Sequence, residues 1–179
     1  PNLRALSKQV KSALFLAHVR ASTGSAINRN SYHHFAVDRW SFMHNGQIGG
    51  FEAACKAADM LIPDALYRHR RSTTDSEAFF LATLGNGLAT DPIGAIARTI
   101  AAFEALATKA PKTRMTSAFS DGEILYAVRY ASDGVAPTLY HRLSTLQKGR
   151  VVVSEPFDAA CGLWQEVPDK NFCVFERQR

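Results

Sequence analysis

The sequence predicts an α+β fold with antiparallel sheets, because strand patterns, then helical patterns, then further strand patterns follow one another along its 179 residues. Short apolar segments typical of strands lie toward both ends of the chain. Helical patterns fill the middle, and two of them have clear start signals. Asp121-Gly122 is a hairpin signal between two of the later strands. Because neither a repeat nor a linker interrupts the chain, we expect a single domain over residues 1–179.

The first strands are predicted from the N-terminal third. Residues 12–20 form a largely apolar run that is typical of a buried strand, and the small, polar residues 22–30 follow as a loop. Residues 40–44 alternate in bulk and predict a second strand. Asn45-Gly46 comes next and is the strongest short turn signal in the chain, since both residues tolerate positive φ. We therefore expect a turn there that can direct backbone N–H groups outward.

Helices are expected only after Gly49. Residues 51–61 show helical periodicity, and Thr74-Asp75-Ser76-Glu77 is a capping box that opens a helix ending near residue 84 or 88. Asp91-Pro92 opens another helix, which reaches about residue 109. The remaining short apolar runs predict strands over residues 113–119, 123–130, 138–141, 150–154 and 172–175.

Composition excludes several classes of protein. An apolar content of 46% with 21% charged residues is ordinary for a globular domain, and no apolar run approaches the ~20 residues of a membrane span. The net charge of +5 raises nucleic-acid binding as an alternative. However, the densest basic cluster, residues 68–71, has no interleaved aromatic residues for base stacking. We interpret it as a solvated loop or an anion-facing edge and expect no nucleic-acid partner.

The cysteines point to a reducing compartment. Cys55, Cys161 and Cys173 are odd in number and have no CxxC spacing, so a disulfide framework is not expected. Cys55 falls in a helical pattern and Cys173 in a strand pattern, which is typical of small buried apolar residues. We predict a cytoplasmic location. His18, His33, His34 and His44 raise a metal site as an alternative, but no ligand spacing accompanies them, and no metal is expected.

Three segments carry groups suited to a small zwitterion with a reactive carbonyl. Arg20, with the Thr23 hydroxyl nearby, could clamp a carboxylate, or could be a surface residue in an ion pair. Asn45 and Gly46 could offer an amide and a backbone N–H to an oxyanion, or form an ordinary hairpin. Asp75 could bind an ammonium group, or serve as a carboxylate favoured by the helix dipole.

Four segments in this order resemble the class II glutamine amidotransferases, which are N-terminal-nucleophile (Ntn) hydrolases. They are residues 15–23 (Phe-Leu-Ala-His-Val-Arg-Ala-Ser-Thr), 42–48 (Phe-Met-His-Asn-Gly-Gln-Ile), 74–77 (Thr-Asp-Ser-Glu), and the pair 152–156 and 164–168 (Val-Val-Ser-Glu-Pro and Trp-Gln-Glu-Val-Pro). The similarity is greatest to the stand-alone YafJ-like and EgtC-like branch. It implies an αββα sandwich and a glutamine or γ-glutamyl substrate, with no cofactor.

The resemblance also implies residue roles. Arg20, with help from Thr23, would hold the α-carboxylate of glutamine, and Asp75 would hold the α-ammonium group. Asn45 and Gly46 would form the oxyanion hole. His33 and His44 would belong to a loop that supports the site. In that loop, Ser31 and His34 replace the asparagine and proline of the family's Asn-x-His-Pro-Phe segment.

The family's nucleophile has no counterpart in this sequence. In the family it is a cysteine at the mature N-terminus, several dozen residues before the segment that Arg20 represents, and its free α-amine acts as the base. Residue 1 here is proline, and the three cysteines lie elsewhere. We therefore expect an N-terminally truncated domain that lacks its first strands and is inactive alone. A binding module that has lost the nucleophile is the alternative, and a sheet edge exposed by the missing strands would favour pairing with another chain, as in a homodimer.

Overall fold

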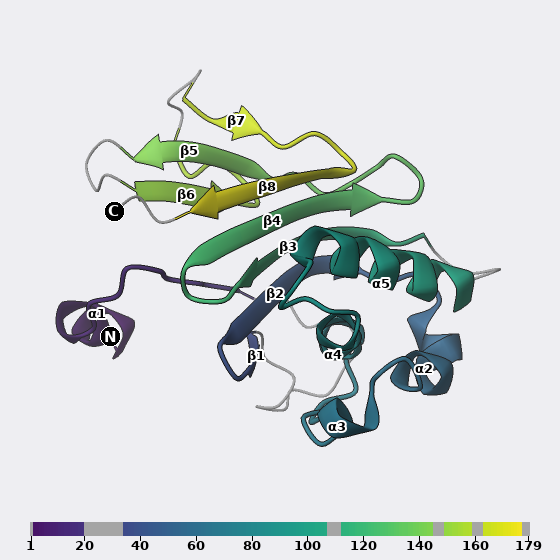
Figure 1. Ribbon diagram of the computed structural model, residues 1–179. Helices are drawn as coiled ribbons and strands as arrows, with labels where there is room; N and C mark the ends of the chain where they lie inside the picture. The colour runs from purple at the N-terminus through teal and green to yellow at the C-terminus, as the bar shows by residue number, and fades with distance from the viewer. Residues whose placement is uncertain (1, 20–33, 107–111, 145–148, 159–162, 177–179) are drawn as a thin grey trace.

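The computed structural model describes residues 2–19, 34–106, 112–144, 149–158 and 163–176. All of the described helices except the first lie on one face of a large antiparallel sheet, whose other face carries a small sheet at one end, and the first helix stands away from both (Figure 1). The helices are α1 (Asn2–Gln9), α2 (Phe51–Asp59), α3 (Asp64–Tyr67), α4 (Asp75–Gly85) and α5 (Pro92–Leu106). The strands are β1 (Phe35–Val37), β2 (Trp40–Gln47), β3 (Arg114–Ser120), β4 (Ile124–Ala131), β5 (Tyr140–Ser144), β6 (Gly149–Val153), β7 (Gln165–Glu166) and β8 (Asn171–Glu176).

The two sheets are antiparallel throughout, which confirms the predicted α+β class. The large sheet has the order β1-β2-β3-β4-β8 and the small sheet the order β6-β5-β7. Asp121-Gly122 joins β3 to β4 as a hairpin, and Gly122 takes a φ of +93° there. The described residues thus give the layer order helix, large sheet, small sheet, which is three of the layers expected of an αββα sandwich.

The main core lies between the large sheet and helices α4 and α5. Helix α4 is buried along most of its length, so it forms the centre of the helical layer. Phe42 of β2 is fully buried, and its ring centroid lies 5.4 Å from that of Phe80 on α4 and 4.5 Å from that of Phe119 on β3. A smaller core around Ala127, Leu139 and Val167 joins the two sheets.

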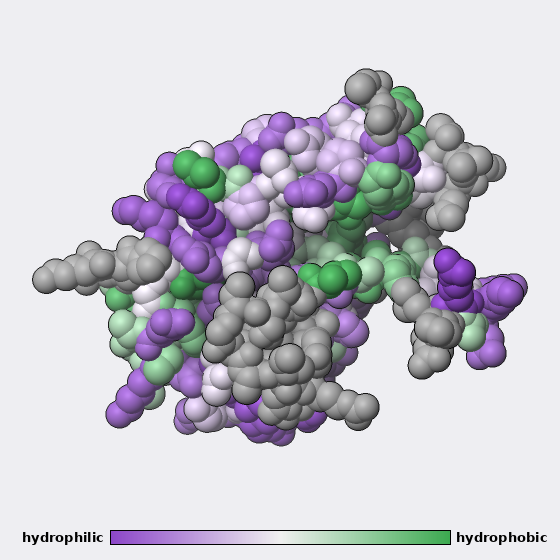
Figure 2. Space-filling view, turned by 180° about the vertical axis from the view of Figure 1, so that it is seen from behind, coloured by the Kyte–Doolittle hydropathy of each residue, from purple (hydrophilic) through white to green (hydrophobic). Residues whose placement is uncertain are grey.

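The strand predicted over residues 12–20 is not formed in the described part of that segment. Residues 14–19 are extended and alternate between half-buried and exposed, as a strand does, but among the described residues no strand pairs with them. A strand needs a neighbour for its backbone groups, so the side-chain pattern alone is not enough. Phe15 and Val19 are exposed as a result. Figure 2 shows hydrophobic surface running toward α1, which stands away from the body.

Other expectations also need correction. The statement that helices begin only after Gly49 is wrong, because α1 occupies Asn2–Gln9. Strands β1 and β7 and helix α3 have two to four residues each, too few for a periodic signal, and were not predicted. The predicted helix start at Asp91 is confirmed, since its carboxylate accepts a hydrogen bond from Gly94 N at 3.0 Å. Among the described residues, no helix is long and apolar enough to cross a membrane.

Candidate functional site

Asn45 and Gly46 lie inside strand β2 and not in a hairpin turn, which corrects the prediction from the sequence. Asn45 is opposite Thr116 and Gly46 is opposite Met115, so β3 pairs with both residues. The chain continues to Gln47 before it turns toward α2. The local turn preference of Asn-Gly is outweighed because β3 supplies a partner from seventy residues away. Both residues are exposed at this end of the strand.

Gly46 does take the positive φ expected of it, although within a strand. Its φ is +136°, and the backbone of β3 passes very close. A Cβ atom built at this position would lie 2.9 Å from the carbonyl carbon of Arg114 and 3.0 Å from the Cα of Met115, with the carbonyl oxygen nearer still. Glycine is therefore required here for both conformational and steric reasons.

Helix α4 begins as the sequence predicted, but only half of the capping box forms. Thr74 is the N-cap, and its side chain accepts a hydrogen bond from Glu77 N at 3.3 Å. Glu77 does not reach back to Thr74 N. Its Oε2 accepts hydrogen bonds from Arg71 N at 3.0 Å and Ser72 N at 2.7 Å, and thereby holds the preceding loop.

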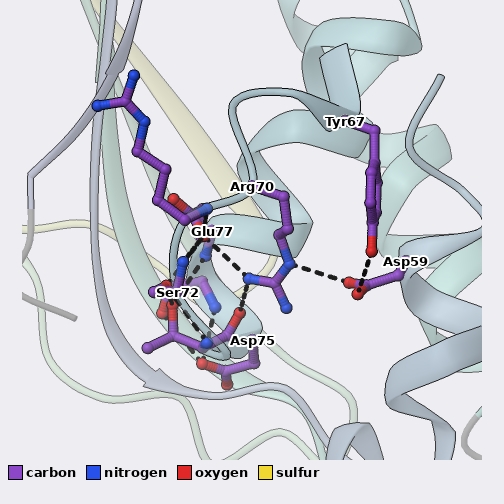
Figure 3. Close-up of polar contacts among 9 residues, drawn as sticks. Asp59, Tyr67, Arg70, Ser72, Asp75 and Glu77 are labelled. Atoms are coloured by element: carbon purple, nitrogen blue, oxygen red, sulfur yellow. Dashed lines mark hydrogen bonds and ion pairs between the residues drawn. The ribbon is translucent and has the colours of Figure 1, made fainter. Parts of the chain in front are cut away.

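Arg70 is the buried cation of this loop (Figure 3). Its side chain is only 7% exposed and forms ion pairs with Asp59 at 3.0 Å and Glu77 at 3.2 Å. It also donates to Thr74 O at 2.7 Å. The prediction that residues 68–71 form a solvated or anion-facing edge therefore fits Arg68 and Arg71, which are exposed. It does not fit Arg70, which is buried and paired with Asp59 and Glu77.

Asp75, on the first turn of α4, is tied directly to the end of β2. Its Oδ2 accepts a hydrogen bond from Ile48 N at 2.9 Å. Its Oδ1 accepts from Ser76 N at 2.7 Å and Ser76 Oγ at 3.1 Å. A second link lies deeper, where Ser76 Oγ and His44 Nδ1 are 2.9 Å apart. The structure thus brings together two of the three predicted segments, with a half-buried carboxylate beside the exposed Asn45 and Gly46.

His44 is a buried residue of β2 and does not belong to a loop. It is 3% exposed, and burial lowers its pKa more than the nearby charge of Asp75 raises it. His18 contributes a smaller lowering of the same pKa. The imidazole is therefore neutral at pH 7 and can support the site through hydrogen bonding.

Arg20, Thr23 and His33 lie outside the described residues, as does Cys161, so their predicted roles remain predictions. Cys55 is exposed on α2 and not buried, while Cys173 is half-buried on β8, beyond β3 and β4 from β2. Within the part of the chain that the structure describes, no group of three or more His, Cys, Asp or Glu side chains could hold a metal ion.

Two groups at this site were not predicted from the sequence. One is Ser76, whose hydroxyl joins His44 to Asp75. The other is the N–H of Ile48, which binds Asp75. Ser76 is part of the predicted capping box, but the capping-box pattern assigns a role only to the N-cap and to the third helical residue, and Ser76 is the second. The partner of a backbone N–H at a strand end has no sequence signature at all.

Comparison with known proteins gives a consistent family. The family of class-II glutamine amidotransferases matches residues 3–176. A probable glutamine amidotransferase, DUG3 of Saccharomyces cerevisiae, is 28% identical over 99% of this chain, which spans 61% of the length of that yeast relative.

Two solved structures are similar. A glutamine aminotransferase class-II domain protein from Silicibacter pomeroyi is 47% identical, with a TM-score of 0.88 over 98% of this chain and 76% of that one. A predicted glutamine amidotransferase from Pseudomonas aeruginosa shares the fold at 18% identity, with a TM-score of 0.52 over 83% of this chain and 63% of that one. With its α+β fold and with Asp75 held against the His-Asn-Gly strand end, this chain belongs to the class II glutamine amidotransferases.

Proposed function

We propose that this domain binds glutamine or a γ-glutamyl compound and cleaves its side-chain amide through a cysteine thioester. Asp75 binds the α-ammonium group, and Arg20, assisted by Thr23, binds the α-carboxylate. The side-chain amide of Asn45 and the N–H of Gly46 stabilise the oxyanion. These groups match the charges of a zwitterionic amino acid and the charge that develops on its amide oxygen.

The observation that carries this proposal is the connection between β2 and α4. The hydrogen bond from Ile48 N to Asp75 Oδ2 spans 2.9 Å and joins the carboxylate to the residue that follows β2, the strand that contains Asn45 and Gly46. The carboxylate proposed to bind the amine lies on α4, and the donors proposed to bind the amide oxygen lie on β2. These two elements are neighbours, so one small ligand can contact both. Among the described residues, three hydrogen bonds reach the Asp75 carboxylate, which leaves one of its about four lone-pair sites for a ligand.

The reaction has two covalent steps. A thiolate attacks the amide carbon, a C–S bond forms, and the oxyanion rests on Asn45 and Gly46. When the oxyanion collapses, the C–N bond breaks, and ammonia or an amine leaves with the proton that the thiol gave to the base. Water then attacks the thioester, which releases glutamate and restores the thiol.

The nucleophile of this proposal is a cysteine at a mature N-terminus, whose α-amine is the base. Cys55 and Cys173 do not fit the role, since they lie within α2 and β8 and neither carries a free α-amine. Because neither of the described cysteines has this base, we also test a second candidate function. This is a non-catalytic amino-acid-binding module with the same pocket.

Glutamate release distinguishes the two functions. The 179-residue chain should release none, whereas a longer product of the same gene with an N-terminal cysteine should hydrolyse glutamine. In that longer protein, Asn45→Ala should lower kcat at least about a hundredfold, as for other oxyanion donors. A coding sequence that starts in frame near Pro1 would favour the binding module. Release by the 179-residue chain that Asn45→Ala abolishes would show that the thiol lies within it.

A further inference from the structure

Behind Asp75, two buried side chains form a hydrogen-bonded chain that leads into the core. Ser76 Oγ donates to Asp75 Oδ1 at 3.1 Å and lies 2.9 Å from Nδ1 of His44. His44 and Ser76 are each only 3% exposed. Neither contact is needed to start the helix, because Thr74 already caps it.

The chain has one direction of proton donation. A serine hydroxyl carries a single hydrogen, and an ionised carboxylate can only accept, so Ser76 donates to Asp75. Ser76 must then accept from His44, which places the imidazole hydrogen on Nδ1. Burial lowers the pKa of His44 and so favours the neutral ring that this arrangement requires. Each member of the chain is thus oriented by the next.

His44 is itself held firmly by its surroundings. Its ring lies 6.3 Å from that of Phe42 at an interplanar angle of 14°. Among the described residues, its Nε2 has no hydrogen-bond partner, so the contact with Ser76 is the polar contact that sets the ring's orientation. A rigid imidazole on a central strand therefore fixes the Ser76 hydroxyl, and through it one oxygen of Asp75.

We propose that Ser76 and His44 are positioning residues for recognition of the ligand's α-amine. They fix Oδ1 of Asp75 while Ile48 N fixes Oδ2, so that the remaining lone pair of the carboxylate points to one place. This inference rests on the proposed function, in which Asp75 binds the ammonium group. A preorganised carboxylate binds an ammonium group more tightly than a freely rotating one, because less entropy is lost.

The test measures selectivity for the amine by titration calorimetry with the 179-residue protein. The two ligands are glutamine and 4-carbamoylbutanoate, which is glutamine without its α-amino group. The ratio of their dissociation constants within one variant is independent of the fraction of protein that is folded. The variants are Ser76→Ala and His44→Phe, which remove the chain, and Ser76→Thr and His44→Asn, which keep a hydroxyl and a donor at the Nδ1 position. Thr83→Ala removes another buried hydroxyl of α4, remote from Asp75, and is the matched control.

We expect Ser76→Ala to lower the preference for glutamine about three- to tenfold, with the affinity for 4-carbamoylbutanoate unchanged. His44→Phe should act in the same direction but less, and Ser76→Thr, His44→Asn and Thr83→Ala should stay near the wild type. If Ser76→Ala left the preference for glutamine unchanged, or weakened the affinity for both ligands equally, the positioning role would be overturned. The proposed function would stand. A wild-type protein that does not bind glutamine would overturn the proposed function and this role together.

Discussion

Replacing Gly46 with alanine should destabilise the domain far more than the same change at an open glycine. Position 46 combines a φ of +136° with a Cβ that would lie 2.9 Å from the carbonyl carbon of Arg114. Gly122 has a φ of +93°, and among the described residues no atom lies within 4 Å of its added Cβ. Gly122→Ala is therefore a matched control that includes the backbone cost without the collision.

The magnitudes follow from these two terms. Positive φ in a non-glycine residue costs about 1–2 kcal/mol, which both variants incur. At Gly46 the backbone of β3 must also move, and forced overpacking adds about 1–3 kcal/mol. Each variant gains a similar, smaller amount from the reduced entropy of the unfolded chain, so this contribution cancels in the comparison. Gly46→Ala should therefore cost about 3 kcal/mol, against about 1 kcal/mol for Gly122→Ala.

Thermal unfolding followed by circular dichroism can resolve this difference. For a domain of this size, 1 kcal/mol corresponds to about 2–4 °C in Tm, so Gly46→Ala should melt about 6 °C or more below the wild type. Gly122→Ala should melt about 2–4 °C below it. If the two variants melted within about 2 °C of each other, the close approach of β3 would not be the reason for glycine at this position.

Three further predictions concern the surroundings of the site. Arg70→Met should lower the free energy of unfolding in urea by about 3 kcal/mol, because it leaves Glu77 buried without its cation, whereas Arg98→Met, in an exposed pair, should lower it much less. Because burial lowers the pKa of His44, the unfolded chain binds more protons below its ordinary pKa of about 6.5. The free energy of unfolding should thus fall from pH 7 to pH 5, and less steeply in His44→Asn; parallel curves would count against a neutral, buried His44. Trypsin should cut early after Lys11, which is exposed and outside any helix or strand; full resistance at this bond would show that Lys11 is covered.

The local signals in the sequence were reliable where they described a single element. Alternation in residues 40–44 predicted β2, Asp91-Pro92 predicted the start of α5, and Asp121-Gly122 predicted the hairpin between β3 and β4. The helix start and the hairpin depend on contacts within a few residues, and the alternation in residues 40–44 reflects the two faces of one strand, so a sequence pattern can represent each of them. The same is true of Thr74, whose cap forms as predicted.

The predictions that failed depend on distant partners. The turn expected at Asn45-Gly46 is replaced by pairing with Thr116 and Met115 on β3. The strand expected over residues 12–20 is not formed over 12–19, because an apolar run cannot supply a neighbouring strand. Neither outcome can be predicted from a local pattern of residues, because the strand that decides it lies far away in the sequence.

Glu77 shows the same competition within one helix start. Its position, three residues after Thr74, predicts a bond back to Thr74 N, but its carboxylate instead meets Arg70 and the N–H groups of Arg71 and Ser72. A buried carboxylate gains more from a cation and two backbone donors than from a single capping bond. The capping box therefore marked the right place for α4 but the wrong partner for Glu77.

Some residues of the proposed site are explained by packing alone, and others are not. Gly46 is required by the approach of β3 and by its own φ, so packing alone explains a glycine there. No such requirement applies to Asn45, which is exposed at the end of β2, or to Asp75, since Thr74 already caps α4. The Asp75 carboxylate also accepts hydrogen bonds from Ile48 N and Ser76 Oγ, and it lies beside that end of the strand. Asn45 and Asp75 therefore support an amino-acid amide site more strongly than the glycine between them.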